Sequence, residues 1–231
     1  MVTDYHALGN LSKIKDRLHV KFIGGLPCLD FVNTVAGRVA SGDRGRDYAD
    51  FVIRDKIAAY HDLLAWSLLA GSVDRPRAIA LARLAARDTQ AAAGVLSRAL
   101  NLRESLYRIF KCAVEGWPPP PPDADILRRE LSVARAHQRL TPHQGAFVWT
   151  FLERPAALDR ILWPVVLSAA ELLTAGDLRN VAQCGGEDCG WLFLDTSRNH
   201  RRQWCDMQDC GNRAKVKRFR ARQPKHAVPP A

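Results

Sequence analysis

Apolar residues recur at helical spacing along most of this chain, and the pattern predicts a body built mainly from helices. Leucine, isoleucine and alanine fall three or four positions apart in four stretches, at about residues 53–70, 77–87, 92–114 and 123–136. A fifth amphipathic stretch covers residues 155–174, where Pro164 is expected to kink the helix or to start a second piece.

One further predicted helix, at about residues 28–39, is apolar nearly all round, which is typical of a buried helix. Its narrow polar stripe holds Asp30, Asn33 and Thr34, with Arg38 one turn further on. The stripe has two interpretations. Either it lines a small-molecule pocket, or its polar groups satisfy one another through caps and packing, and we favour the second.

Other segments break the helical pattern. Residues 1–20 have weak periodicity and are expected to be loose or to form a short helix, and residues 41–47 are expected to form a polar loop. Trp117 and the prolines of 118–122 predict an extended spacer. Aromatic and β-branched residues around a Pro-His-Gln-Gly turn predict a β-hairpin at 138–152.

Charge is concentrated at the C-terminal end. The chain has a formal net charge of +10, and residues 198–225 hold ten Lys or Arg against two Asp, a local charge of +8. A positive field confined to one end of a nearly neutral body is typical of a module that binds a polyanion.

Four of the six cysteines form two Cys-x4-Cys pairs, and we predict that they bind one structural zinc ion. The ligands would be Cys184, Cys189, Cys205 and Cys210. Four thiolates leave no open coordination position, which argues against a catalytic ion. An iron–sulfur cluster is a weaker alternative, and a redox switch at the thiolates stays open. Cys28 and Cys112 lie among apolar residues and are expected in the core.

The N-terminus shows no secretory signal, and the most apolar stretch is too short and too polar to span a bilayer. We therefore expect a cytoplasmic protein without a membrane partner. The sequence shows no phosphate loop, nucleophile elbow or paired acidic motif, so an enzyme is not expected.

The tail reads Phe-Leu-Asp at 193–195, Ser-Arg-Asn at 197–199, Arg-x-Trp-Cys at 202–205 and Cys-Gly-Asn-Arg at 210–213. These elements closely resemble the CGNR zinc finger family. The Gly-Gly at 24–25 and the string Leu-Asp-Phe-Val-Asn-Thr at 29–34 resemble the opening of the ABATE domain that precedes this finger. The resemblance implies a bacterial, stress-induced transcription regulator.

Together these features predict two parts. Residues 1–176 would form a mainly helical α+β body with a small sheet or hairpin. Residues 177–231 would form a small, treble-clef-like zinc finger with four cysteine ligands, ending in a basic helix. On a helical wheel, Asn212, Val216 and Phe219 form a stripe that we expect to dock on the finger, leaving basic rows on both sides.

The leading hypothesis is a DNA-binding transcription regulator in which the basic helix enters the major groove. The expected nucleic-acid contacts are basic side chains of the tail: Arg198, Arg201, Arg202, Arg213, Lys217, Arg218 and Arg220. Arg213 could instead brace the metal site through Asp195 or Asp206, and Asn212 is expected to bond the knuckle backbone.

Two alternatives belong to other classes. One is an RNA-binding protein, although the tail offers few aromatic side chains for stacking. The other is a zinc-stabilised protein-interaction module. Under each of these hypotheses, the body could bind a small-molecule effector or form a homodimer.

Overall fold

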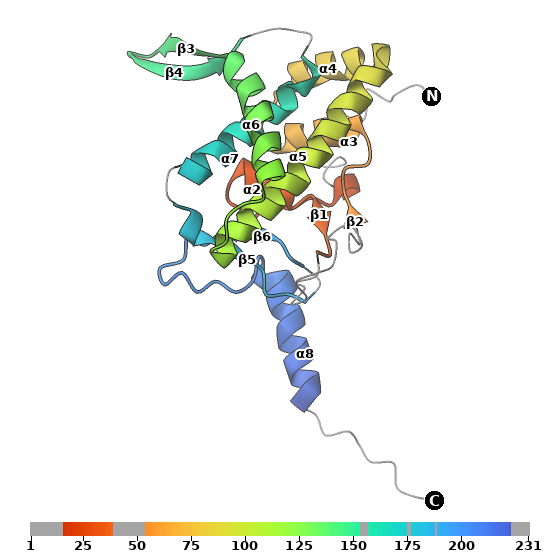
Figure 1. Cartoon of the computed structure of the whole chain (residues 1–231). Helices are drawn as coiled ribbons and strands as arrows, with labels where there is room; N and C mark the ends of the chain where they lie inside the picture. The colour runs from red at the N-terminus through yellow and green to blue at the C-terminus, as the bar shows by residue number, and fades with distance from the viewer. Residues whose placement is uncertain (1–15, 39–53, 153–156, 175–176, 188, 223–231) are drawn as a thin grey trace, which may run out of the picture.

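The computed structural model describes residues 16–38, 54–152, 157–174, 177–187 and 189–222. These residues form a helical body with three small antiparallel pairs of strands. The expected fold class, mainly α with small sheets, is confirmed. Figure 1 shows helix α8 (Asn212–Arg222) extending away from the lower end of the body, while a hairpin projects from the upper end.

In the described part of the chain, five helices surround the core of the body, and capping signals mark the ends of several of them. They are α3 (Tyr60–Leu69), α4 (Arg75–Arg87), α5 (Thr89–Glu115), α6 (Pro121–Ala136) and α7 (Trp163–Thr174). Asp74 and Asp88 accept hydrogen bonds from backbone N–H groups at the starts of α4 and α5. Gly116 ends α5 in the left-handed conformation, at a φ of 73°.

The core of the body is continuous from α2 to the C-terminal strands. Trp66, Trp163, Tyr107, Phe31 and Phe110 are among its fully buried side chains. It also includes Val181 and Leu192, which come from the segment predicted to form the finger. The body and the C-terminal part therefore share apolar packing.

The helix predicted at residues 28–39 is shorter than expected. Helix α2 covers Pro27–Val32, and a short strand, β1 (Val35–Ala36), follows it. The Thr34 hydroxyl donates to the Phe31 carbonyl at 2.7 Å, and the Asn33 side chain bonds another segment. These side-chain bonds compete with helical ones, and the β-branched residues favour a strand.

The prediction of a helix at residues 53–70 was wrong for the first third of that range. Strand β2 (Arg54–Asp55) pairs with β1, and α3 begins only at Tyr60. The Asp55 carboxylate accepts from the Ile57 N–H at 2.9 Å, and Asp62 accepts from the Ala59 N–H at 3.1 Å. These two turns interrupt a sequence whose apolar spacing alone looked helical.

The predicted hairpin is confirmed as β3 (Gln138–His143) paired with β4 (Ala146–Phe151). The fifth predicted helix consists of two pieces, η3 (Leu158–Leu162) and α7, with Pro164 in the first turn of the second piece. The last prolines of the expected spacer start α6 instead.

Residues 1–15 and the loop predicted at 41–47 lie outside the described residues, as do Val39, Ile53 and Pro155. Among the helices of the described part, none is long and apolar enough to cross a membrane.

Candidate metal centre and basic helix

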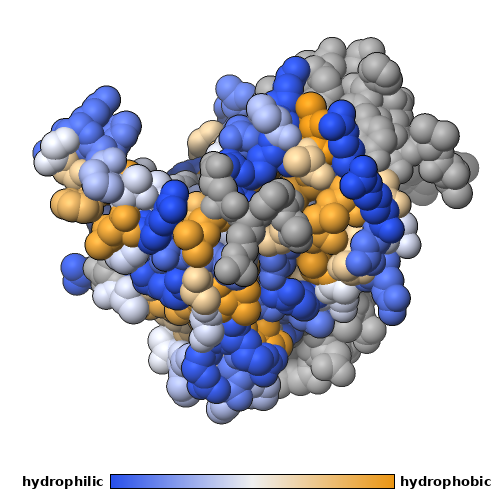
Figure 2. Space-filling view, turned by 90° about the horizontal axis from the view of Figure 1, so that it is seen from above, coloured by the Kyte–Doolittle hydropathy of each residue, from blue (hydrophilic) through white to orange (hydrophobic). Residues whose placement is uncertain are grey.

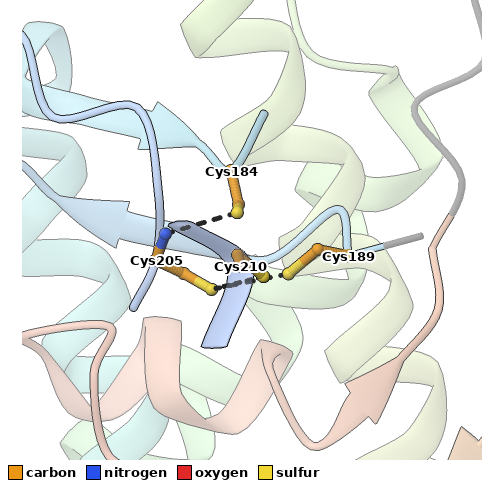
Figure 3. Close-up of side chains that lie close together, drawn as sticks. All are labelled: Cys184, Cys189, Cys205 and Cys210. Carbon is orange, nitrogen blue, oxygen red and sulfur yellow. Dashed lines mark hydrogen bonds between the residues drawn. The ribbon is translucent and has the colours of Figure 1, made fainter. Parts of the chain in front are cut away.

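The four paired cysteines converge on one point. Cys184 follows strand β5 (Val181–Gln183), and Cys189 precedes β6 (Leu192–Leu194) in the same hairpin. Cys205 lies two residues before η5 (Met207–Gly211), the turn that leads into α8, and Cys210 lies within it. All four are buried, and their sulfur atoms lie within 4.8 Å of one another (Figure 3). Two segments only 16 positions apart therefore supply two ligand candidates each.

The spacing of the sulfurs fits a tetrahedral metal ion. Zinc–sulfur bonds of about 2.3 Å place tetrahedral sulfurs about 3.8 Å apart. The Cys189 sulfur lies 3.5 Å from that of Cys205, which lies 3.6 Å from that of Cys210. None of these cysteines forms a disulfide. Four sulfurs this close cannot all ionise alone, whereas a divalent cation stabilises them as thiolates.

Each residue of the Cys-Gly-Asn-Arg motif makes a contact in or beside the cysteine cluster. Cys210 supplies a sulfur, and Gly211 lies against Trp204 and Met207, where a Cβ would come 2.9 Å from the Met207 sulfur. The Asn212 side-chain amide donates to the Gln208 carbonyl at 3.0 Å. Arg213 donates to the Cys210 sulfur at 3.1 Å and pairs with Asp209 at 3.3 Å. The motif builds the knuckle and offsets thiolate charge.

Arg202 is also committed to the structure of the finger. It donates from Nε to the Trp204 carbonyl at 2.9 Å and from Nη2 to the Cys205 carbonyl, and its guanidinium lies over the Phe193 ring. The buried Asp195 accepts from the backbone N–H groups of Ser197 and Arg202, both at 2.9 Å. Two of the Arg202 donors therefore stabilise the loop before Cys205.

The expectation for Arg213 is corrected. It braces the centre, as one of its two interpretations held, but through Asp209 and the Cys210 sulfur rather than Asp195 or Asp206. Asp206 pairs instead with Lys21, at 2.8 Å. Nothing in the sequence pointed to Lys21, because the two residues are 185 positions apart.

The finger is joined to the body along strand β6. Asn33 donates to the Leu192 carbonyl at 2.7 Å and accepts from the Leu192 N–H at 3.0 Å. The Leu194 N–H donates to the Gly24 carbonyl at 2.8 Å, and the Trp191 indole donates to the Val35 carbonyl at 2.7 Å. The segment that resembles the ABATE opening therefore acts as a hydrogen-bonding partner of the finger.

Two glycines allow this close approach. At Gly190, with a φ of 64°, a Cβ would lie 2.2 Å from the carbonyl oxygen of Arg38. At Gly24, a Cβ would lie 2.8 Å from the Cβ of Leu29. Neither position has room for a side chain.

Most polar groups of the N-terminal stripe bond partners within the protein, although the buried Arg38 Nε has none among the described residues. Asp30 accepts from the Gly24 N–H at 2.8 Å, and burial raises its pKa to about 6. Thr34 accepts from Arg103 at 3.1 Å, and Arg38 forms two bonds to Glu104, at 2.7 and 2.8 Å. These bonds agree with the interpretation that we favoured, in which the stripe serves caps and packing.

A cleft of about 600 Å³ does open beside them, between the body and the finger. Its wall carries both signs of charge, from Lys21, Lys56, Arg213, Asp55, Asp62 and Asp209. Three of the four clustered cysteines also line it. Several of these charges pair with one another, such as Lys21 with Asp209 at 3.5 Å. The cleft gives solvent a path to the metal centre.

Helix α8 is orientated differently from our expectation. Its Val216 and Phe219 side chains are 47% and 64% exposed, so the apolar stripe does not dock on the finger. Ala214 and Ala221 instead line a groove of about 540 Å³ that Trp204 and the Gly185–Gly186 turn complete. The side of α8 that carries the small side chains therefore faces the knuckle across this groove, and Val216 and Phe219 point outward.

The remaining basic side chains of the tail are accessible. Arg198, Arg201 and Arg220 are exposed. Lys217 pairs with Glu187 at the rim of the groove, and Arg218 makes one long contact, at 3.5 Å, to the Ala214 carbonyl. Exposed pairs of this kind are weak and exchange readily with other partners.

The joint between Asn33 and Leu192 can be tested by substitution. Asn33→Leu leaves the buried N–H and carbonyl of Leu192 without partners, so we expect the free energy of unfolding to fall by about 2–4 kcal/mol. Urea unfolding of the metal-loaded protein measures this change.

Asn212→Ala is the matched control, since it removes the same type of side chain from an exposed contact. We expect a loss below about 1 kcal/mol there. If the two variants are equally stable, Asn33 does not hold the finger to the body.

Comparisons with known families agree with this geometry. The model of the ABATE family, described as "Putative stress-induced transcription regulator", matches residues 25–176, and that of the CGNR zinc finger matches residues 180–223. A comparison with curated proteins finds no match. Because the ABATE match covers more than half of the chain and the finger match follows it directly, the chain belongs to the ABATE family and carries a C-terminal CGNR zinc finger.

Proposed function

We propose that this protein is a DNA-binding transcription regulator whose α8 enters the major groove. The observation that carries the proposal is the state of α8: it extends from the finger, buries no residue, and holds six Lys or Arg but no acid in 11 residues (Figure 1). An isolated helix of this length is marginal in water, so a partner that fits it would stabilise it. With its side chains an α-helix is about 10–12 Å across, which suits a major groove about 12 Å wide.

The outward face of α8 supports a role in recognising DNA bases. Val216 and Phe219 lie on a stripe with basic rows on both sides, formed by Arg213 and Arg220 on one side and Lys215 and Arg222 on the other. Apolar side chains can contact thymine methyl groups, while flanking cations neutralise phosphates. We assign the phosphate contacts beside this stripe to Lys215 and Arg220, helped by Arg198 and Arg201 from the preceding loop. Lys217 and Arg218, which we also expected to contact nucleic acid, line the groove on the other side of α8.

In this proposal the metal is zinc, which the four thiolates would hold as a closed structural site. Its role is to fix the knuckle from which α8 extends, and we propose no enzymatic activity. The body would supply regulation, as a sensor of a small molecule or as a dimerisation module, and the protein would act in the bacterial cytoplasm.

RNA is the second candidate partner, favoured by the groove beside α8, in which Trp204 lies near Arg213 and Lys217. Competition between duplex DNA and structured RNA of equal length distinguishes the two. Preference for RNA would replace the DNA proposal.

Removing two charges from α8 tests the phosphate contacts. For Lys215→Gln with Arg220→Gln, we expect the slope of log affinity against log salt to fall by about 2, because each lost contact removes about one unit. Fluorescence anisotropy of a labelled duplex at several salt concentrations gives this slope.

The matched control is Arg83→Gln with Arg87→Gln, which removes equal charge from exposed positions on α4. We expect no change in the slope. Equal losses in the two double variants would mean that net charge, rather than α8, attracts the nucleic acid.

Phe219 tests whether the outward stripe contacts bases. For Phe219→Ala we expect duplex affinity to fall about 10-fold at an unchanged salt slope, because an apolar contact releases no counterions. The same titration measures both quantities. If Phe219→Ala changed the salt slope but left the duplex affinity unchanged, Phe219 would not contact the bases.

Zinc dependence can be tested through Cys205→Ser. We expect loss of the ion and faster hydrogen exchange over residues 203–222, with α3, α5 and α7 still protected, since a structural zinc supplies much of the folding energy of its module. Metal analysis and exchange mass spectrometry read out both effects. Cys112→Ser, outside the centre, should keep the zinc, and stoichiometric zinc in Cys205→Ser would disprove the ligand assignment.

A further inference from the structure

The β3–β4 hairpin, here called the arm (residues 138–151), carries large apolar side chains on one face. In the strand register, Leu140 lies opposite Trp149, and Pro142 lies opposite Phe147. Side chains alternate between the two faces of a strand, so these four share one face. Phe147 is 70% exposed, Trp149 59% and Leu140 54%. The arm therefore presents a continuous apolar strip to solvent.

The root of the arm is fixed to the core. Phe151 continues the apolar strip and lies 5.3 Å from the Trp163 ring, measured between centroids. The His137 ring stacks on Trp163 at 4.1 Å, and the Leu152 N–H donates to the His137 carbonyl at 2.7 Å. Figures 1 and 2 show the outer part of the arm standing clear of the body. Its direction is therefore set by the core.

The opposite face of the arm is mostly polar. There the hydroxyl oxygens of Thr141 and Thr150 lie 2.6 Å apart, and Arg139 and His143 are exposed. An amphipathic hairpin of this kind needs cover on one side only. Because a two-stranded hairpin alone is marginal in water, covering the apolar face also stabilises the arm.

The charge of the face indicates what covers it. None of Leu140, Pro142, Phe147 and Trp149 ionises, although the chain as a whole carries +10. A nucleic acid or an acidic protein would be bound by cations, which this face lacks. An uncharged apolar surface of the same width is what the same face of a second copy offers, and a two-fold axis pairs them without like-charge repulsion.

The area of the face sets the strength of such a contact. With the exposures above, the four side chains would bury about 400 Å² in each copy, or about 800 Å² in total. Stable dimers bury more, roughly 1,200–2,000 Å². The contact would therefore be reversible, with a dissociation constant in the micromolar range.

We propose that the arm is a dimerisation element, in which the apolar faces of two copies pack against each other about a two-fold axis. The dimer carries two α8 helices, so a DNA that spans both helices would bind with avidity. The contact itself does not depend on nucleic acid or zinc, so it can be tested even if the proposed function fails.

The test is sedimentation velocity of the full-length zinc-loaded protein over a range of concentrations. Wild type is expected to shift from monomer to dimer, and Phe147→Ser with Trp149→Ser to raise the dissociation constant at least about 30-fold, because central aromatic residues dominate such contacts. Val148→Thr is the matched control: it lies between the two on β4 but faces the other side. It should dimerise like wild type.

Hydrogen exchange of wild type gives a second measurement that needs no variant. The amides of residues 138–151 should exchange more slowly at high protein concentration than at low concentration. Monomeric wild type at about 100 µM, well above the expected dissociation constant, would overturn the proposal. So would an unchanged dimer in the double variant, or binding of the arm to lipid vesicles as a monomer.

Discussion

Pairing of the finger backbone with the N-terminal motif is the constraint on which the rest of the structure depends. Strand β6 is short, and Asn33 and Gly24 bond its backbone, while Val35 accepts from the Trp191 indole just before it. Asn33 satisfies both the N–H and the carbonyl of Leu192, which an apolar neighbour could not do. This joint fixes the finger on the body and thereby sets the direction in which α8 leaves the molecule.

The joint also gives the two family motifs a common purpose. The polar groups of the N-terminal string bond the finger or its surroundings. The Cys-Gly-Asn-Arg motif likewise serves the knuckle, since Asn212 and Arg213 bond groups within it. Recognition of a partner is then left to residues beyond the motif, on the exposed faces of α8.

The molecule has two projecting elements with different surfaces. At one end α8 presents cations around a narrow apolar stripe, and at the other the arm presents an apolar strip without charge. Cations attract a polyanion over several ångströms, whereas an uncharged apolar strip acts only on contact. The two surfaces therefore suit different partners, and a regulator that dimerises and binds DNA would use both.

Cysteine spacing, charge and apolar periodicity by themselves determined the fold class, the hairpin, the metal-binding group and the basic end, because each depends on residues close together in the chain. Only the tertiary structure decided the end of α2 at Val32, the start of α3 at Tyr60 and the orientation of α8. Asn33 is polar by sequence, but its partner is 159 positions away. Local patterns cannot reveal such pairs, so Asn33, Lys21 and Arg202 acquired their roles only when folding brought their partners together.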